Sequence, residues 1–195
     1  MRRLVPLLVL SVAAPLLSGC FFGVAATGIG ATALLADDRR TAGMYIEDEN
    51  IEWKALARFN SAFRNAHLNA TSFNRKVLLT GEVPGEEMKA AVEAEVKAIP
   101  SVREIANEIV VAGNSSLTSR GNDTIITSSV KSRMVGNKAF SPNHVKVVTE
   151  AGTVFLMGLV TPAEGEAAVE IARSTSGVSR VVKAFEYLPE SPKRP

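Results

Sequence analysis

The side chains that could perform catalysis are few and scattered. The chain has two histidines, His67 and His144, at predicted loop or strand-entry positions, and its one cysteine lies far away near the N-terminus. General acid–base chemistry needs a second titratable group positioned beside the histidine, so a lone histidine is more often structural or exposed. Several glutamates crowd one predicted helix without an apolar pocket to tune them, which favours a solvated face. These are Glu86, Glu87, Glu93 and Glu95.

Motifs for phosphate, nucleophile or metal chemistry are missing from the sequence. No P-loop, GxSxG motif or metal-ligand spacing occurs in the 195 residues. Removing Arg2 and Arg3, which lie in a segment expected to be cleaved, leaves 20 basic against 20 acidic residues. A nucleic-acid-binding protein would keep a positive excess. We therefore expect no enzyme activity, no cofactor, no metal and no nucleic-acid partner.

The cysteine is informative through its position. Residues 1–20, MRRLVPLLVLSVAAPLLSGC, have a basic start, an apolar centre, and the small residues Ser18 and Gly19 directly before Cys20. This stretch resembles a bacterial lipoprotein signal, which is cleaved before the cysteine so that the thiol can be acylated. We predict a signal peptide at 1–19 and lipidation of Cys20, with a buried, unmodified cysteine as the alternative.

Residues 20–45 are predicted to be the lipidated cysteine and a tether. The apolar stretch 21–36, FFGVAATGIGATALLA, has 16 residues and is shorter than the ~20 that a spanning helix needs. It is interpreted as a segment lying along the bilayer surface, with a flexible linker as the alternative. Phe21 follows the cysteine where an aspartate would favour inner-membrane retention, so the resemblance to lipoproteins implies the outer membrane.

An internal repeat organises the rest of the chain. Gly81 and Gly158 each end an apolar predicted strand, and their surroundings match at an offset of 77 residues. The upstream segments DENIEWKALARFNSAF, from Asp48, and DTIITSSVKSRMVGNKAF, from Asp123, also align. A solenoid would use a shorter unit many times, so two copies at this spacing predict two domains.

Each copy predicts the element order αββαβ. Asp48 or Asp123 is the expected N-cap of the first helix, and Pro84 or Pro162 is expected to open the second helix. A tight turn joins the first two strands, and a third strand ends the copy. A three-stranded mixed sheet with two helices on one face satisfies this order and leaves the other sheet face wetter.

This pattern resembles the BON domain, and tandem copies behind a lipobox resemble the dual BON-domain outer-membrane lipoproteins. The stretches DRRTAGMYIEDENIE, NDTIITSSVKSR and VKVVTEAGTVFLMGLVT carry the closer match. The resemblance implies an α+β fold with two tandem BON domains. The domains are expected at 46–112 and 122–188, with a linker at 113–121 and a C-terminal tail at 189–195.

The first helix of the second copy is the candidate interaction surface. Ile126 and its neighbours at four-residue spacing are expected to face the core, whereas Ile125 points about 100° away. The first helix of copy one carries four acidic against three basic side chains, but its counterpart carries one acid against three bases. A single exposed isoleucine is ordinary. The other interpretation is an interfacial helix that inserts an apolar tip and sets hydroxyls and cations against anionic headgroups.

In the family, this helix binds phosphatidylglycerol, and the resemblance implies the same partner here. An aromatic residue commonly follows Asn-Asp-Thr in the family, whereas this chain has isoleucine, which prefers the interface less strongly. The candidate phospholipid-binding residues are Ile125, Ser129, Lys131, Ser132, Arg133 and Lys138.

The leading hypothesis is therefore a non-enzymatic, lipid-anchored outer-membrane protein that faces the periplasm. It would bind anionic phospholipid such as phosphatidylglycerol and support outer-membrane integrity. The alternative is a protein-interaction adaptor for the envelope assembly or division machinery. A cell-wall scaffold is a third hypothesis, but the sequence offers no aromatic platform for sugars, and Trp53 is predicted to pack in the core or between domains.

Overall fold

The computed structural model describes residues 38–189, and the described chain from Arg39 onward forms one compact unit. The predicted signal peptide, Cys20 and most of the predicted tether lie outside the described residues. Among residues 38–189, none of the helices combines the length and apolar character that crossing a bilayer requires.

The first domain follows the predicted order αββαβ, with its last strand broken in two. The central strand β2 pairs antiparallel with β1 and parallel with both β3 and β4. The register is the same on either side of the break, because Leu79 lies opposite Asn107 and Glu82 opposite Val110. The elements are α3 (Ala42–Ala62), β1 (His67–Phe73), β2 (Lys76–Val83), α4 (Glu86–Lys97), β3 (Glu104–Asn107) and β4 (Val110–Val111).

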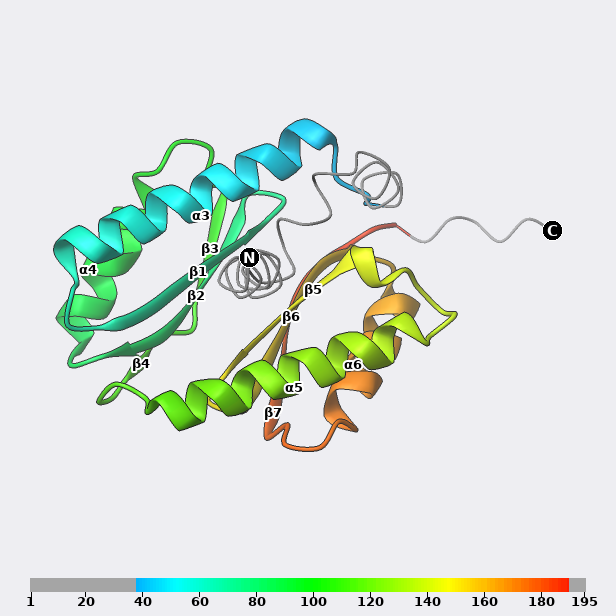
Figure 1. Ribbon diagram of the computed structural model, residues 1–195. Coiled ribbons are helices and arrows are strands. Elements are labelled where there is room, and N and C mark those ends of the chain that lie inside the picture. The colour runs from blue at the N-terminus through cyan, green and yellow to red at the C-terminus, as the bar shows by residue number, and fades with distance from the viewer. Residues whose placement is uncertain (1–37, 190–195) are drawn as a thin grey trace, which may run out of the picture. The chain divides into compact units, whose positions relative to one another are not determined.

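The second domain repeats this architecture with an unbroken last strand. The central strand β6 pairs antiparallel with β5 and parallel with β7. In each domain the two helices cover the same face of the sheet (Figure 1), as the sequence predicted. The elements are α5 (Leu117–Val135), the 3₁₀ helix η3 (Pro142–His144), β5 (Val145–Glu150), β6 (Thr153–Val160), α6 (Pro162–Arg173) and β7 (Arg180–Tyr187).

The core of the second domain lies between its helices and its sheet. Ile126, Val130 and Met134 of α5 are buried there, as their four-residue spacing predicted. They pack on alternate residues of the central strand, such as Val154 and Leu156. Ile51, Ala55 and Phe59 of α3 have the same role in the first domain.

The prediction that the second face of each sheet is wet was wrong. The other set of alternate residues, including Leu78 in the first domain and Phe155 and Met157 in the second, forms a third buried apolar cluster shared by the two domains. Because strand side chains alternate between faces, a strand that is apolar at every position is buried on both. The residues of β2 from Val77 to Val83 are all buried.

The predicted N-caps were also wrong. The N-caps are Thr41 and Ser116, whose hydroxyls accept from the backbone of Met44 and Ser119. Asp48 and Asp123 lie inside their helices and are buried. Helix α5 therefore begins at Leu117, within the segment 113–121 that the sequence analysis assigned to a linker.

Each buried aspartate holds the turn between the first two strands of its domain. Asp123 accepts from the backbone N–H groups of Ala151 and Gly152 at 2.9 and 2.8 Å. Asp48 accepts from those of Asn74 and Arg75, both at 2.8 Å. All four turn residues have positive φ, as in the tight hairpin turns that match strand twist. The N–H groups of the turn point into the domain, and the carboxylates accept the hydrogen bonds that these groups would otherwise lack.

The second helices start differently in the two domains. Pro162 is the first residue of α6, as predicted, and Thr161 and Glu164 complete a capping box before it. Helix α4 instead begins at Glu86 after Gly85, with no side-chain cap, so the prediction that Pro84 opens it is off by two residues.

Candidate functional site

The outward face of α5 carries a row of exposed apolar side chains. Ile125 is 66% exposed, Leu117 83% and Val135 71%. At 100° per residue, Leu117 and Val135 each lie about 80° from Ile125, on the same side of it. We call these three residues the α5 stripe. Of these three residues, Ile125 alone was predicted from the sequence to point outward. Leu117 was not predicted to belong to this face because the helix was expected to start six residues later, at Asp123.

Hydroxyl side chains flank the α5 stripe, but most use their hydrogens within the helix. Ser129 donates to the carbonyl of Ile125 at 2.8 Å, and Ser128 to that of Thr124 at 2.9 Å. This back-bonding is common for serine in helices. The oxygens can still accept a hydrogen bond, whereas donation to a phosphate requires a change of rotamer. Ser132 is exposed on the same side of α5.

The three candidate cations have different surroundings. The Arg133 guanidinium donates to the carbonyl of Ile171 at 3.0 Å and to the hydroxyls of Ser174 and Thr175 at 3.0 and 2.7 Å. It therefore holds the end of α6 against α5, where a cation is favourable. This contact was not foreseen, because it joins residues 38 to 42 positions apart.

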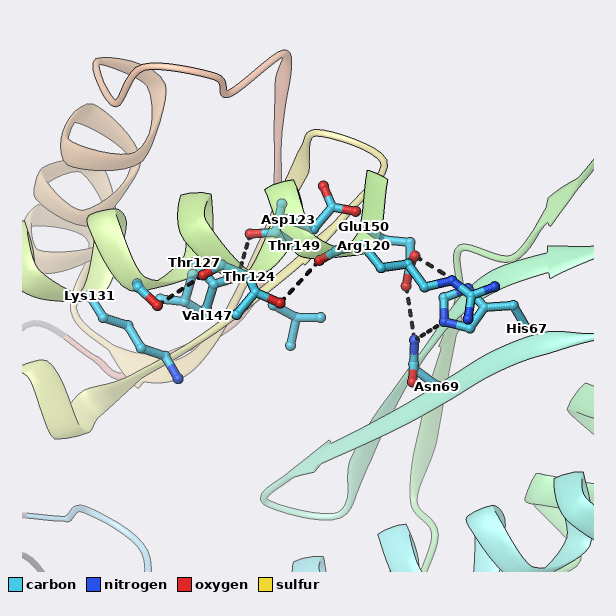
Figure 2. A pocket seen from close by; sticks show the side chains of 12 residues that line it. His67, Asn69, Arg120, Asp123, Thr124, Thr127, Lys131, Val147, Thr149 and Glu150 are labelled. Carbon is cyan, nitrogen blue, oxygen red and sulfur yellow. Dashed lines mark hydrogen bonds and ion pairs between the residues drawn. The ribbon is translucent and has the colours of Figure 1, made fainter. Parts of the chain in front are cut away.

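The two lysines remain as outward cations. Lys138 is exposed in the loop after α5. Lys131 lines a groove of about 480 Å³ between α5 and β5, shown in Figure 2. Burial, and then the charge of Lys146, lower the pKa of Lys131. Together the two lysines leave positive charge at the C-terminal half of α5, next to Val135.

The exposed surface of α5 presents no carboxylate. Its one acidic residue, Asp123, is 5% exposed and is engaged by the hairpin turn of its own domain. The surface is therefore apolar, hydroxyl-bearing and cationic. This is the side-chain composition of helices that lie in the interface of an anionic bilayer.

A second group of polar side chains meets at one end of the groove. His67 of β1, Glu82 of β2 and Glu150 of β5 place potential ligand atoms within 4.8 Å of one another. Glu150 belongs to the second domain and the other two to the first. No metal site was predicted from the sequence, because residue spacing cannot reveal a cluster assembled from two domains.

Trp53 is the clearest departure from the sequence-based predictions in the first domain. Its side chain is 68% exposed on α3, where the sequence analysis placed it in a core or between domains. Ile46 and Leu56, at 60% and 44% exposed, lie near it on the same side of the helix. Unlike the α5 stripe, this apolar row stands among acidic residues such as Glu49.

The chain contains two α+β domains with the same fold, arranged in tandem. Comparison with known proteins shows which family these domains belong to. The family model of the BON domain matches residues 47–113 and again residues 122–189. The chain therefore belongs to the BON domain family and carries two BON domains.

Three relatives cover most of the chain. It is 38% identical over 175 residues to the outer membrane lipoprotein DolP of Haemophilus influenzae, a match that covers 88% of this chain and 90% of that protein. It is 33% identical over 154 residues to a 21 kDa hemolysin of Actinobacillus pleuropneumoniae, covering 77% and 79%. It is 25% identical over 144 residues to the osmotically-inducible protein Y of Escherichia coli, covering 71% and 72%.

Proposed function

We propose that this chain is a lipid-anchored protein of the outer membrane that faces the periplasm and binds anionic phospholipid through α5. It acts without catalysis and supports the integrity of the envelope. The observation that carries the proposal is the outward face of α5, where three exposed apolar residues are spread along the helix, lysines lie towards its C-terminal end, and no carboxylate is exposed. The similarity to an outer membrane lipoprotein supports the location and the acyl anchor.

The energetics suit a protein that is already anchored. Lys131 and Lys138 can each contribute about 1 kcal/mol near an anionic surface, less screening. Burying the α5 stripe adds a few kcal/mol, at roughly 1.5–3 kcal/mol for a fully buried aliphatic side chain. These terms alone give weak, reversible binding. Acylation at Cys20 supplies stable attachment and raises the local concentration of lipid, so a weak contact suffices to select anionic regions.

The test is flotation of the compact unit 39–195, which lacks the anchor, with vesicles of defined composition. We expect it to float with vesicles containing phosphatidylglycerol and to stay in solution with phosphatidylcholine alone. Ile125→Glu places a carboxylate in the α5 stripe and is expected to abolish flotation. Asn50→Glu, at the matching position of α3, is the control and is expected to change nothing. Equal flotation of the two variants would refute the role of α5.

Salt distinguishes the electrostatic from the apolar contribution to membrane binding by α5. Raising the ionic strength from about 0.1 M to 1 M shortens the Debye length from about 10 Å to 3 Å. The lysine contribution is then screened, while the apolar contribution persists. We expect flotation to fall strongly in high salt, and unchanged flotation would assign the selectivity to something other than charge.

An adaptor for envelope proteins is the second candidate function, and α3 favours it. Trp53 with Ile46 and Leu56 forms an exposed apolar row beside a groove of about 270 Å³ that Glu49 and Glu52 also line. Glu52 is paired with Lys146 at 2.6 Å, so Glu49 supplies the acidic character of this surface. The Glu49 carboxylate opposes an anionic bilayer but suits a basic protein segment. A photo-crosslinker placed at Trp53 in intact envelopes should then capture a protein, whereas one at Ile125 should capture lipid.

A further inference from the structure

The cluster at the junction of the two domains has the geometry of a small ion site. His67 Nδ1 lies 3.0 Å from Glu82 Oε2 and 3.6 Å from Glu150 Oε1. A tetrahedral ion with bonds of 2.0–2.2 Å separates its ligand atoms by about 3.3 Å. These two spacings bracket that value. Figure 2 shows His67 and Glu150 approaching each other from opposite domains.

The cluster holds more negative charge than its surroundings compensate. The side chains of His67, Glu82 and Glu150 are 16%, 8% and 11% exposed. Within residues 38–189, no lysine or arginine lies within 4.0 Å of either carboxylate. Arg120 lies next to the cluster, where its guanidinium donates to the hydroxyl and carbonyl oxygens of Ser115 rather than to either carboxylate. Two carboxylates thus share one neighbouring cation, and a buried charge without a counterion is costly. Burial, with a smaller contribution from Glu82, raises the pKa of Glu150.

Neighbouring groups hold the three side chains in place. Asn69 Nδ2 donates to Glu150 Oε2 at 3.0 Å and lies 3.3 Å from His67 Nε2. The backbone N–H of Ser115 donates to Glu82 Oε2 at 3.1 Å. Such outer contacts are typical of metal ligands, whose orientation they fix. An ion on Nδ1 would displace the ring hydrogen to Nε2, and rotation of the Asn69 amide would present an oxygen to accept it.

The combination of donor atoms selects the kind of ion. One imidazole nitrogen with two carboxylates suits Zn²⁺ and similar first-row divalent ions, whereas Ca²⁺ and Mg²⁺ prefer oxygen ligands throughout. The groove between α5 and β5 is lined at one end by His67, Asn69 and Glu150, so a hydrated ion can reach the site from solvent.

We propose that His67, Glu82 and Glu150 bind one divalent transition-metal ion of the Zn²⁺ class and that this ion links the two BON domains. The site is specific to the junction. His144 occupies the matching position of the second domain, but Leu159 stands there in place of Glu82. The proposal is independent of lipid binding, because none of the three ligands belongs to α5.

The test measures Zn²⁺ binding to the full chain in detergent micelles, with any affinity tag removed and bound metal stripped by a chelator. Calorimetric titration is expected to give one equivalent of Zn²⁺. His67→Ala and Glu150→Gln are expected to weaken binding by about 100-fold or more, because even the loss of an outer contact to a ligand costs about 10- to 100-fold. His144→Ala removes the other histidine and is expected to leave the affinity unchanged.

Thermal unfolding provides a second readout that does not depend on a damaged variant. Zn²⁺ should raise the melting temperature of the wild-type chain and of His144→Ala, but not that of the isosteric Glu150→Gln. Absence of stoichiometric binding to the wild type would overturn the proposal, as would full binding by Glu150→Gln. The proposal would also be overturned if mild acid stabilised the chain and Zn²⁺ did not bind. Protons, rather than a metal ion, would then neutralise Glu82 and Glu150.

Discussion

The two BON domains share a fold but differ at the surfaces of their first helices. Ile51 and Ile126 occupy matching buried positions, and so do Asp48 and Asp123. At exposed positions the two helices carry different residues: Asn50 corresponds to Ile125, and Trp53 corresponds to Ser128. The buried positions must fill a core and hold a turn, so both copies keep them. The exposed positions carry no such demand and are available for different partners.

The difference extends to charge. Helix α3 presents carboxylates beside Trp53, whereas α5 has one acid, buried in its own domain. With first helices that differ in this way, an anionic membrane is the expected partner of α5 and a protein the expected partner of α3. The two proposed functions therefore involve different domains and can be tested separately.

The largest expected effect is the loss of a buried aspartate, and it should be larger in the first domain. Asp48 accepts from Ser72 Oγ at 2.7 Å and from Arg40 at 2.9 Å besides its two turn N–H groups. Asp48→Asn should cost about 3–5 kcal/mol, as when one partner of a buried ion pair is removed. Asp123→Asn should cost about 1.5–3 kcal/mol, because it breaks hydrogen bonds alone.

Urea denaturation measures both losses, with the exposed Glu87→Gln as a control that should change stability by less than about 0.5 kcal/mol. Equal losses for the two aspartates would show that the Arg40 ion pair contributes nothing.

The glycines inside the central strands, Gly81 of β2 and Gly158 of β6, should also differ, with the larger loss of stability again in the first domain. A Cβ at Gly81 would lie 2.0 Å from the carbonyl oxygen of His67, and one at Gly158 would lie 2.2 Å from that of His144. Gly81 also has φ +117°, which favours glycine. Gly158→Ala should cost about 1–3 kcal/mol through overpacking, and Gly81→Ala should cost more because backbone strain adds to it. A thermal melt in which Gly158→Ala is the more damaged variant would contradict this ranking.

Arg133 and Lys131 should separate stability from lipid binding within α5. Because the Arg133 guanidinium is held at the end of α6, Arg133→Ala should lower stability by about 1.5–3 kcal/mol and leave flotation nearly unchanged. Lys131→Ala should weaken flotation and leave stability nearly unchanged. Urea midpoints and flotation of the same samples test both. A loss of flotation in folded Arg133→Ala would return this arginine to the lipid-binding surface.

The smallest expected effect concerns the cap that α6 has and α4 lacks. Contacts with Arg39 lower the pKa of Glu164 from its ordinary value of 4.5 to about 2. The carboxylate therefore stabilises the fold above pH 4.5, and this stabilisation is lost as the pH falls towards 2. Glu164→Gln should lower stability at pH 7 by about 1 kcal/mol, and the deficit should shrink below pH 4.5.

Melting temperatures between pH 7 and pH 3 check this dependence, and Glu166→Gln, on the exposed side of α6, is the matched control. A deficit that stays constant with pH would mean that the charge of Glu164 is not responsible.

The sequence alone determined the features that depend on local pattern. The repeat, the order αββαβ, the two helices on one face and the buried row of Ile126, Val130 and Met134 follow from periodicity and turn residues. Periodicity also separated Ile125 from the core. Lipidation of Cys20 and lipid binding by α5 stay predictions.

Tertiary structure decided whatever depends on contacts between distant residues. Asp48 and Asp123 resemble N-caps locally, but a hairpin about 27 residues further on takes their carboxylates into the domain. The second sheet faces are dry because the other domain covers them. The guanidinium of Arg133 is held by the end of α6 because that helix ends beside it. The junction of His67, Glu82 and Glu150 exists only where two domains meet, and no spacing along one chain encodes that meeting.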